Sequence, residues 1–452
     1  MKVENRTGHS VFLSDLNVSF CPVEECGAIE ITHQDLLKSM SLRNIIRHGA
    51  FVPTEWNKEN KLESSLSKES HTSVSNAKST KPNEKDGIVL RGQFLDYSGY
   101  AKVNRNLASC MVENGIKVCI NAVDSSTPRL IGADLTLSSN FSYTNASVGD
   151  IIIDSIVPST DVARGRRKTI LYTTVESYSI PSSFSAIFDK YDEIWTTSNF
   201  CKSVIEDKTS KQVIVVPGIV DFLNYKEDGD RFDLAGQAKS FKFISVFNWN
   251  YRKGADALIR AYCKAFSGSD DVSLILVCRK KRISGPASGV RDEIEKEIAK
   301  SSSLNPPHIM RVTKEINEIQ LAELYRSCNA FVLPSRGEGY GLPYLEASLC
   351  GLPVIGTKVS AIKDILSSDN SLLVDIDSIK KVPSNATGCY FWDGHLMADL
   401  TSNAFIDRLA DSMKDMIKNY QLYVEKNKVL KRNTCNNSSS EAVFNIIKDK
   451  IH

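Results

Sequence analysis

The chain has 452 residues, 42% of them hydrophobic and 24% charged, which is enough apolar material for two or three domains with sizeable cores. Its 56 Lys and Arg residues nearly balance its 54 Asp and Glu residues. The resulting net charge of +2 creates no overall basic field, so neither general nucleic-acid binding nor attraction to an anionic membrane surface is expected.

Cysteines and hydrophobic runs bear on the cellular compartment. The eleven cysteines are scattered, and only Cys21 and Cys26 lie close together, without a second pair or histidines at zinc-ligand spacing. We interpret that pair as ordinary packing, with redox chemistry as the alternative. The first residues lack the apolar segment of a signal peptide, and no run approaches the roughly 18 apolar residues of a membrane span. The sequence therefore predicts free thiols in a soluble cytoplasmic protein.

The first part of the chain differs in character from the rest. Residues 1–55 combine a short β-like piece at residues 10–13 with an expected helix over residues 34–48, which predicts a small N-terminal module of unknown role. Residues 56–85 are dominated by Ser, Lys, Glu, Asn and Thr, with little to bury. That composition predicts a flexible linker.

From residue 86 onward, apolar strand-like runs alternate with amphipathic helical patterns, and they do so in two series. The first series has strands at 87–92, 116–122, 150–156, 168–174, 192–197 and 212–217, with a helix over 100–114 after the first strand. The second has strands at 241–247, 272–278, 308–313, 330–333 and 354–355, with helices over 255–266, 290–301 and 318–328. Helical periodicity returns from about residue 403 to the end.

Alternation of this kind builds parallel sheets with helices on both faces. The fold class is therefore α/β, with two doubly wound Rossmann-like domains. The expected boundaries are 86–235 for the first domain, 236–418 for the second and 419–452 for a C-terminal helical segment.

Ligands of doubly wound sheets bind beyond the carboxyl ends of the strands. Four polar loops follow strands in this way, at residues 96–101, 172–177, 248–254 and 335–341. We expect all four to face one cleft between the domains.

Two carboxylates, Glu338 and Glu346, stand eight positions apart around a glycine-rich turn. Glu338 falls on the loop after an apolar strand, and Glu346 falls early in a helix that begins near Pro343. Gly339 and Gly341 let the backbone approach a ligand, and the helix start favours an anion. One carboxylate suits sugar hydroxyls and the other a ribose. The alternative is a plain turn, with Glu346 as a carboxylate that only complements the helix dipole.

Arg252 and Lys253 are adjacent cations before a helix start, where side-chain charge adds to backbone amides. A diphosphate fits such a site, and a solvated surface pair is the alternative. The run from Arg279 to Arg282 is also basic. It is either a guide for a phosphate-bearing acceptor or a solvated loop.

These segments together resemble the donor half of family 4 retaining glycosyltransferases, which have the two-domain GT-B architecture. In the second domain the resemblance lies in residues 252–261, 330–335, 338–347 and 351–357. In the first domain it lies in residues 173–176, 192–200 and 215–221. The resemblance covers roughly residues 86 to 452, and the combined pattern is specific although each piece alone is weak.

The resemblance implies a role for each matching position. Arg252 and Lys253 would bind the donor diphosphate, Glu338 would contact the transferred sugar, and Glu346 would hold the ribose. Glu176 would lie near the reacting centre or the acceptor. The remaining implied donor-site positions, which act through the backbone, are Gly99, Gly339, Tyr340, Gly341 and Leu342.

The implied reaction is transfer of a hexose from a UDP- or GDP-linked sugar to an unidentified acceptor, a glycan, a lipid-linked molecule or another, with retention at the anomeric carbon. Arg and Lys can neutralise the leaving phosphate, and the sequence has no Asp-x-Asp metal site, so no metal or other cofactor is expected. The chain departs from the family in two places. Phe247-Asn248 stands where a Gly-Arg pair is common, and no histidine lies between His71 and His308. Glu176 or backbone groups would then take the role of the first-domain histidine.

Two other functions remain open from the sequence. One is another GT-B enzyme acting on nucleotide sugars, an epimerase or a hydrolase. The other is a nucleotide-sugar-binding component of a larger assembly, in which residues 1–55 dock onto a partner protein.

Overall fold

The structure is a computed structural model in which two parallel sheets form the body of the molecule. It describes strands within residues 2–55 and residues 87–123, 142–143, 149–234, 236–279, 289–301, 304–312, 316–383 and 395–451. The expected helix over 34–48, Cys21, Cys26, the linker 56–85 and residues 280–282 of the basic run lie outside the described residues.

The described strands of the N-terminal segment form two small antiparallel sheets. One has the order β4-β1-β5 and the other pairs β2 with β3. The β-like piece at residues 10–13 is confirmed as β2. The strands are β1 (Lys2–Asn5), β2 (Val11–Leu13), β3 (Val18–Phe20), β4 (Ile29–Glu30) and β5 (Phe51–Glu55).

The first domain is built on a seven-stranded sheet, counted over the described strands, in the order β12-β11-β10-β9-β6-β7-β8, and every pair is parallel. Its central strands are buried along their length because helices and loops cover both faces. The strands are β6 (Ile88–Gly92), β7 (Val118–Ala122), β8 (Ser142–Tyr143), β9 (Ile151–Ser155), β10 (Lys168–Thr173), β11 (Glu193–Thr196) and β12 (Val213–Val215). The helices are α4 (Gly99–Glu113), α6 (Ser183–Phe188) and α7 (Asn199–Glu206).

The second domain has a six-stranded parallel sheet among the described residues, in the order β15-β14-β13-β16-β17-β18. The strands are β13 (Phe241–Asn248), β14 (Val272–Arg279), β15 (His308–Val312), β16 (Ala330–Leu333), β17 (Val354–Thr357) and β18 (Leu372–Val374), beside a small pair β19 (Ile379–Lys381) and β20 (Leu396–Ala398). The helices are α8 (Ala255–Ala265), α9 (Val290–Lys300), α10 (Glu318–Arg326), α11 (Leu342–Leu349), α12 (Ile362–Ile365) and α13 (Asn403–Lys418), with a 3₁₀ turn η1 (Tyr251–Lys253). The α/β class with two Rossmann-like sheets is confirmed.

Two local sequences fix where the helices of the site begin. Ser98 caps α4, because its hydroxyl accepts a hydrogen bond from the amide of Ala101 at 3.2 Å. Gly254 separates η1 from α8 in the left-handed conformation, with φ 66°, which favours glycine. A Cβ at Gly254 would lie 2.0 Å from the carbonyl oxygen of Pro334, so glycine is also needed for the close approach of the two loops.

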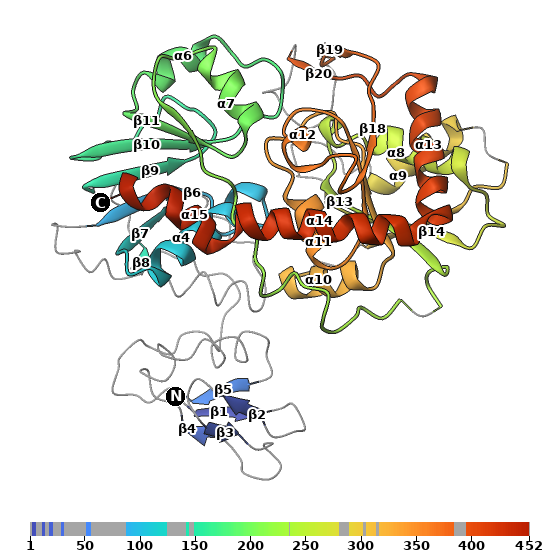
Figure 1. Cartoon of the computed structure of the whole chain (residues 1–452), viewed down its shortest axis with the longest axis horizontal. Helices are drawn as coiled ribbons and strands as arrows, with labels where there is room; N and C mark the ends of the chain where they lie inside the picture. The colour runs from blue at the N-terminus through green and yellow to red at the C-terminus, as the bar shows by residue number, and fades with distance from the viewer. Residues whose placement is uncertain are drawn as a thin grey trace.

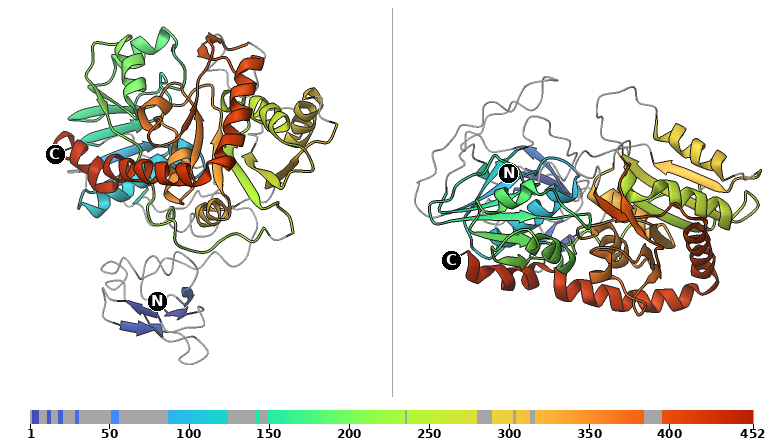
Figure 2. Two further views of the ribbon diagram at one scale, coloured as in Figure 1. Left: turned by 45° about the vertical axis from the view of Figure 1, so that its right-hand side comes forward. Right: turned by 90° about the horizontal axis from the view of Figure 1, so that it is seen from above.

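The C-terminal helices connect the two domains (Figures 1 and 2). α14 (Tyr420–Ser438) leaves the second domain, where it packs on α11, and α15 (Ser440–Ile447) packs on α4 of the first domain. A short 3₁₀ turn η3 (Lys448–Lys450) follows. The amide of Val220 donates to the carbonyl of Ser438 at 3.0 Å, next to the break between α14 and α15. The last helices therefore brace the segment that joins the sheets.

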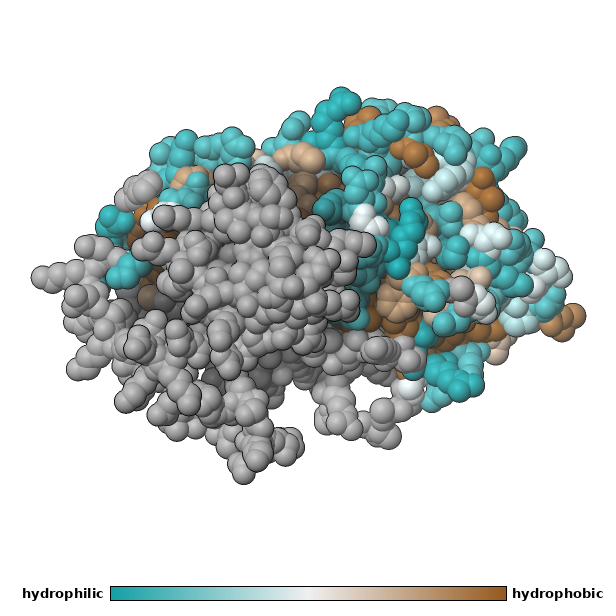
Figure 3. All heavy atoms as spheres, turned by 90° about the horizontal axis from the view of Figure 1, so that it is seen from below, coloured by the Kyte–Doolittle hydropathy of each residue, from teal (hydrophilic) through white to brown (hydrophobic). Residues whose placement is uncertain are grey.

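In the part of the chain that the structure describes, no helix is both long and apolar enough to span a bilayer. On the face shown in Figure 3, hydrophobic residues are interspersed with hydrophilic ones. The expected cytoplasmic location stays a prediction.

Candidate active site

The loop from β16 to α11 and the loop from β13 to α8 lie against each other at the carboxyl edge of the second sheet. The amide of Arg336 donates to the carbonyl of Arg252 at 2.7 Å, and the Arg252 guanidinium donates to the carbonyl of Gly337 at 2.8 Å. These two hydrogen bonds bring the basic pair and the acidic loop together at the ends of the neighbouring strands β13 and β16.

Glu338 is the centre of this meeting point. Its Oε2 lies 2.6 Å from Nη1 of Arg252, and its Oε1 lies 2.6 Å from Nζ of Lys253. Ser335 donates its hydroxyl to the same carboxylate, and the amide of Glu338 donates to the hydroxyl of Ser360 at 2.7 Å. All three charged side chains are buried, so each charge depends on its partners.

The electrostatics of the group follow from burial and pairing. Burial raises the pKa of Glu338, but Arg252 and Lys253 outweigh burial and leave that pKa at about 2. Burial and the neighbouring Arg252 lower the pKa of the Lys253 ammonium, although Glu338 and Glu176 oppose them. Arg252 and Lys253 thus keep the buried Glu338 carboxylate ionised at neutral pH.

Glu176, on the loop after β10, brings the first domain to this group. Its carboxylate lies 2.7 Å from Nη2 of Arg252 across the domain boundary. Burial raises the pKa of Glu176, and Glu338 raises it further, while Arg252 and Lys253 lower it. The four residues expected at the reacting centre are therefore linked by three ion pairs, in which Arg252 contacts Glu176 and Glu338 and Lys253 contacts Glu338.

The two domains meet closely at the glycine-rich loop. Thr197 and Ser198 both donate their hydroxyls to the carbonyl of Gly339, at 2.8 and 2.9 Å. A Cβ at Gly337 would lie 2.0 Å from the carbonyl oxygen of Glu176. A Cβ at Gly339 would lie 1.8 Å from Oγ1 of Thr174. These glycines are required by the closed contact between the domains.

Glu346 belongs to a second group, on the other side of the glycine-rich loop. Its Oε1 lies 2.6 Å from Nζ of Lys102, a residue of α4 in the first domain. Lys102 also lies 2.7 Å from Oε2 of Glu318, the first residue of α10. Burial raises the pKa of Glu346, Lys102 lowers it and Glu318 raises it again.

The remaining expected residues contribute in different ways. Tyr340 and Leu342 have buried side chains, and the Tyr340 hydroxyl is hydrogen-bonded to that of Ser438 in α14, so any ligand contact would come from their backbone. Gly341 has φ 99° and caps α11. Gly99 is exposed, and a Cβ built there would have no heavy atom within 4 Å, so no neighbouring atom requires glycine at this position.

Three supporting residues were not found from the sequence. Arg336 is fully buried, pairs with Asp256 of α8 at 2.7 Å and lies 3.9 Å from the centre of the Tyr251 ring. Ser360 has a φ of 39° and reaches Glu338 from the loop after β17. Lys102 reaches Glu346 from the other domain. An arginine in a loop, a serine or a helical lysine carries no distinctive pattern, so only the assembled fold identifies them.

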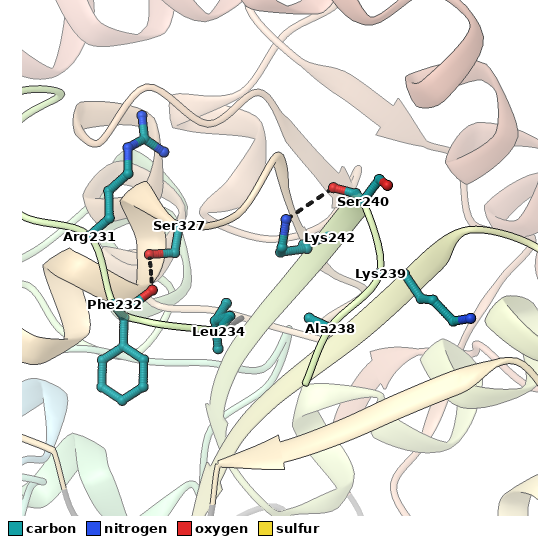
Figure 4. A pocket seen from close by; sticks show the side chains of 8 residues that line it. All are labelled: Arg231, Phe232, Leu234, Ala238, Lys239, Ser240, Lys242 and Ser327. Carbon is teal, nitrogen blue, oxygen red and sulfur yellow. Dashed lines mark hydrogen bonds between the residues drawn. The ribbon is translucent and has the colours of Figure 1, made fainter. Parts of the chain in front are cut away.

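Two cavities lie outside the charged groups. One, of about 240 Å³, lies at the carboxyl ends of β6 and β9, and its lining includes Arg91, Gln93, Tyr100, Ser155 and Ser159. The other, of about 450 Å³, lies at the start of β13 and contains none of the expected site residues (Figure 4). It is lined by Arg231, Phe232, Leu234, Ala238, Lys239, Ser240, Lys242 and Ser327.

Comparison with protein families supports the resemblance in the second domain. Residues 238–385 match the family model described as glycosyl transferases group 1. This stretch contains the Arg252 loop, the Glu338 loop and Glu346. The resemblance to this group of enzymes is therefore confirmed for residues 238–385, the stretch that carries the two carboxylates.

Individual proteins that are similar in sequence to this chain are also glycosyltransferases. The chain is similar to the lipopolysaccharide core biosynthesis mannosyltransferase LpsB of Rhizobium meliloti, with 27% identity over 173 residues, 36% of this chain and 45% of that protein. It is also similar to the D-inositol 3-phosphate glycosyltransferase of an Arthrobacter species, with 25% identity over 217 residues, 47% of this chain and 45% of that protein. The matched region spans just under half the length of each relative.

Solved structures resemble the whole two-domain body. HepE of Anabaena, determined in complex with UDP and glucose, has a TM-score of 0.59 at 14% identity and covers 81% of this chain and 99% of its own. Sucrose-phosphate synthase of Thermosynechococcus elongatus has a TM-score of 0.57 at 15% identity, and the match covers 81% of this chain and 98% of that protein. At these identities the likeness concerns the fold, which is GT-B.

Proposed function

We propose that the protein is a retaining glycosyltransferase that moves a hexose from a UDP- or GDP-linked sugar to an acceptor. The observation that carries the proposal is the convergence of Arg252, Lys253, Glu338 and Glu176 between two Rossmann-like sheets. The group 1 match over residues 238–385 and the glycosyltransferase relatives support it.

The donor would bind where the paired charges now meet. Arg252 and Lys253 would hold the diphosphate, Glu338 the transferred sugar and Glu346 the ribose. In the closed structure these side chains neutralise one another, so the donor would replace the contacts of Glu338 with its own phosphate and hydroxyl groups. The UDP and glucose bound to the Anabaena protein of similar fold support a nucleotide sugar as the donor.

The chemistry follows from the position of the cations. The bond between the anomeric carbon and the phosphate oxygen breaks, and the acceptor oxygen forms its bond on the same face of the sugar. The acceptor proton passes to the departing phosphate. Negative charge grows on that phosphate, and a fixed donor beside such charge is typically worth about 10²- to 10³-fold in rate. Glu176 lies beside Arg252 and would face the reacting centre or the acceptor.

The acceptor would occupy the cavity of about 240 Å³ in the first domain. The cavity lies at the carboxyl ends of parallel strands, where ligands of doubly wound sheets bind. Gln93, Tyr100 and Ser155 offer donors and acceptors of hydrogen bonds, whereas the guanidinium of Arg91 is already paired with Asp154 and Asp161. A small molecule rich in hydroxyl groups suits this lining.

Ligand-induced stabilisation tests the donor assignment. UDP, GDP and ADP, and then the matching nucleotide sugars, would be compared by thermal shift. A ligand present at 100 times its dissociation constant adds about 2.7 kcal/mol of stability. The expected result is stabilisation by UDP or GDP, a larger effect of one of its sugars, and weaker binding by Glu346→Gln. Glu295→Gln, in an exposed position on α9, is the control.

Turnover assays separate the competing functions. Release of the nucleoside diphosphate only when an acceptor is present supports transfer. Donor consumption without an acceptor indicates a hydrolase or an epimerase. Binding with no turnover of any donor indicates a nucleotide-sugar-binding component of a larger assembly. Unchanged nucleotide affinity in Glu346→Gln removes that residue from its role.

A further inference from the structure

Lys102 is a first-domain residue whose ammonium group pairs with two carboxylates of the second domain. It lies in the first turn of α4, and its Nζ is 2.6 Å from Glu346, 2.7 Å from Glu318 and 3.1 Å from the hydroxyl of Tyr225. The Lys102 ammonium is also 5.2 Å from the centre of the Tyr225 ring. The side chains of Lys102, Glu346 and Glu318 are 14%, 2% and 12% exposed. Water therefore screens these charges little.

The charges of this group do not balance without Lys102. Two carboxylates share one ammonium, and each carboxylate alone would be costly to bury. Burial lowers the pKa of Lys102, but Glu318 and Glu346 outweigh burial and raise it, so the lysine stays charged. Burial also raises the pKa of Glu318, but Lys102 and Tyr225 outweigh burial and bring that pKa below its usual value. The pKa of Glu346 remains above its usual value, because burial and Glu318 raise it, and Lys102 from the opposite domain lowers it.

We propose that Lys102 is a positioning residue of the donor site, which orients the Glu346 carboxylate for the ribose once the two domains close. The inference rests on the proposed function, because it takes Glu346 as the ribose carboxylate. Lys102 acts through Glu346 and need not touch the nucleotide.

Domain closure and ribose binding become linked in this arrangement. When the domains separate, α4 carries Lys102 away, and Glu346 and Glu318 are left facing each other without their shared cation. A protonated Glu346 would donate one hydrogen bond and accept weakly, whereas the carboxylate makes charge-assisted bonds to ribose hydroxyls. The titratable groups that face Glu346 are Lys102, Glu318, Tyr225, Tyr325, Asp221 and Cys350.

Affinity measurements with altered sugars test the proposal. Calorimetric titration would compare UDP and GDP with their 2′,3′-dideoxyribose counterparts, between pH 6 and pH 8. Lys102→Met should bind the ribonucleotide about 10- to 100-fold more weakly, the range for a lost charge-assisted hydrogen bond. It should bind the dideoxy form almost as well as the wild type does. The loss should grow as the pH falls, because protonation of Glu346 then competes with ribose binding.

Three further variants keep the test decisive. Lys102→Arg retains the charge and should recover most of the affinity. Lys117→Met removes an exposed lysine of the same domain and should change nothing. If Lys102→Met does not fold, Glu318→Gln serves instead, because Lys102 then has Glu346 as its one remaining carboxylate partner in this group. Glu318→Gln should extend ribonucleotide binding to lower pH.

The outcomes distinguish this inference from the proposed function. Equal losses for ribose and dideoxyribose ligands, or no loss in Lys102→Met, overturn the positioning role while wild-type nucleotide binding still supports the donor site. Unchanged pH dependence in Glu318→Gln also overturns it. No nucleotide binding by the wild type overturns both.

Discussion

Glu338 shows how much a single side chain of this site depends on its neighbours. It is a buried carboxylate with two cations, a serine hydroxyl and a backbone amide around it. Removing one member of such a group leaves the others buried without a counter-charge, which is more costly than losing one surface ion pair. The residue that the sequence marked for sugar contact is therefore also a residue on which local stability depends.

The pKa of Glu338 gives this stability a pH dependence. The pKa is about 2 in the folded protein against an ordinary value of 4.5, so its contribution is complete above pH 4.5 and is lost as the pH falls toward 2. In urea unfolding, the pH-dependent part of the stability gap between wild type and Glu338→Gln should be on the order of 3 kcal/mol near pH 6. It should shrink steadily below pH 4.5.

Exposed Glu295→Gln on α9 is the matched control and should show little gap at any pH. A gap for Glu338→Gln that stays constant from pH 6 to pH 3 would show that the carboxylate is not held ionised by Arg252 and Lys253.

At the scale of elements, the site depends on loops that approach within backbone contact. Arg336 connects the Glu338 loop to the start of α8 through its ion pair with Asp256. Gly254 and Gly337 have no side chain, which allows neighbouring backbone segments to come this close. The contact at Gly337 is with the first domain, so this glycine controls how closely the domains meet.

Gly337→Ala should therefore hold the domains apart. Its Cβ would lie 2.0 Å from the carbonyl oxygen of Glu176, and backbone on both sides has little freedom to yield. We expect a larger radius of gyration by small-angle X-ray scattering and a lower turnover rate. Gly87→Ala is the control, because its Cβ would meet only the Lys117 carbonyl at an ordinary 3.7 Å. An unchanged scattering curve for Gly337→Ala would mean that the closed contact is absent in solution.

The sequence predicted the sheet-forming elements well because apolar runs and helical periodicity are local signals. The strand expected at 330–333 is β16 and the helix expected over 318–328 is α10, nearly residue for residue. β18 and α12 were not predicted, since three or four residues carry too little periodicity. The meeting of Arg252 with Glu338 followed from the rule on carboxyl ends of strands. The partners of Glu346 did not, because they depend on how the two domains close.

For the whole molecule, the closed state is held by polar contacts at several places between the domains. Glu176 pairs with Arg252, Lys102 with Glu346 and Glu318, and Thr197 and Ser198 with the Gly339 carbonyl. Interfaces made of polar contacts of this kind open and close more readily than apolar ones. We therefore expect the domains of this protein to separate and return.

Nucleotide binding should report this motion directly. Arg252, Lys253 and Glu338 are buried and paired with one another, so a ligand can reach them only after the domains open. In stopped-flow measurements the observed rate of UDP or GDP binding should level off at the rate of opening as the nucleotide concentration rises. Thr197→Val removes one hydroxyl that donates to Gly339 and should raise the plateau about 2- to 10-fold, the value of one ordinary hydrogen bond. Thr209→Val, away from the domain contact, should leave the plateau unchanged. An observed binding rate that rises linearly with nucleotide concentration throughout would show that the site is open before the nucleotide arrives.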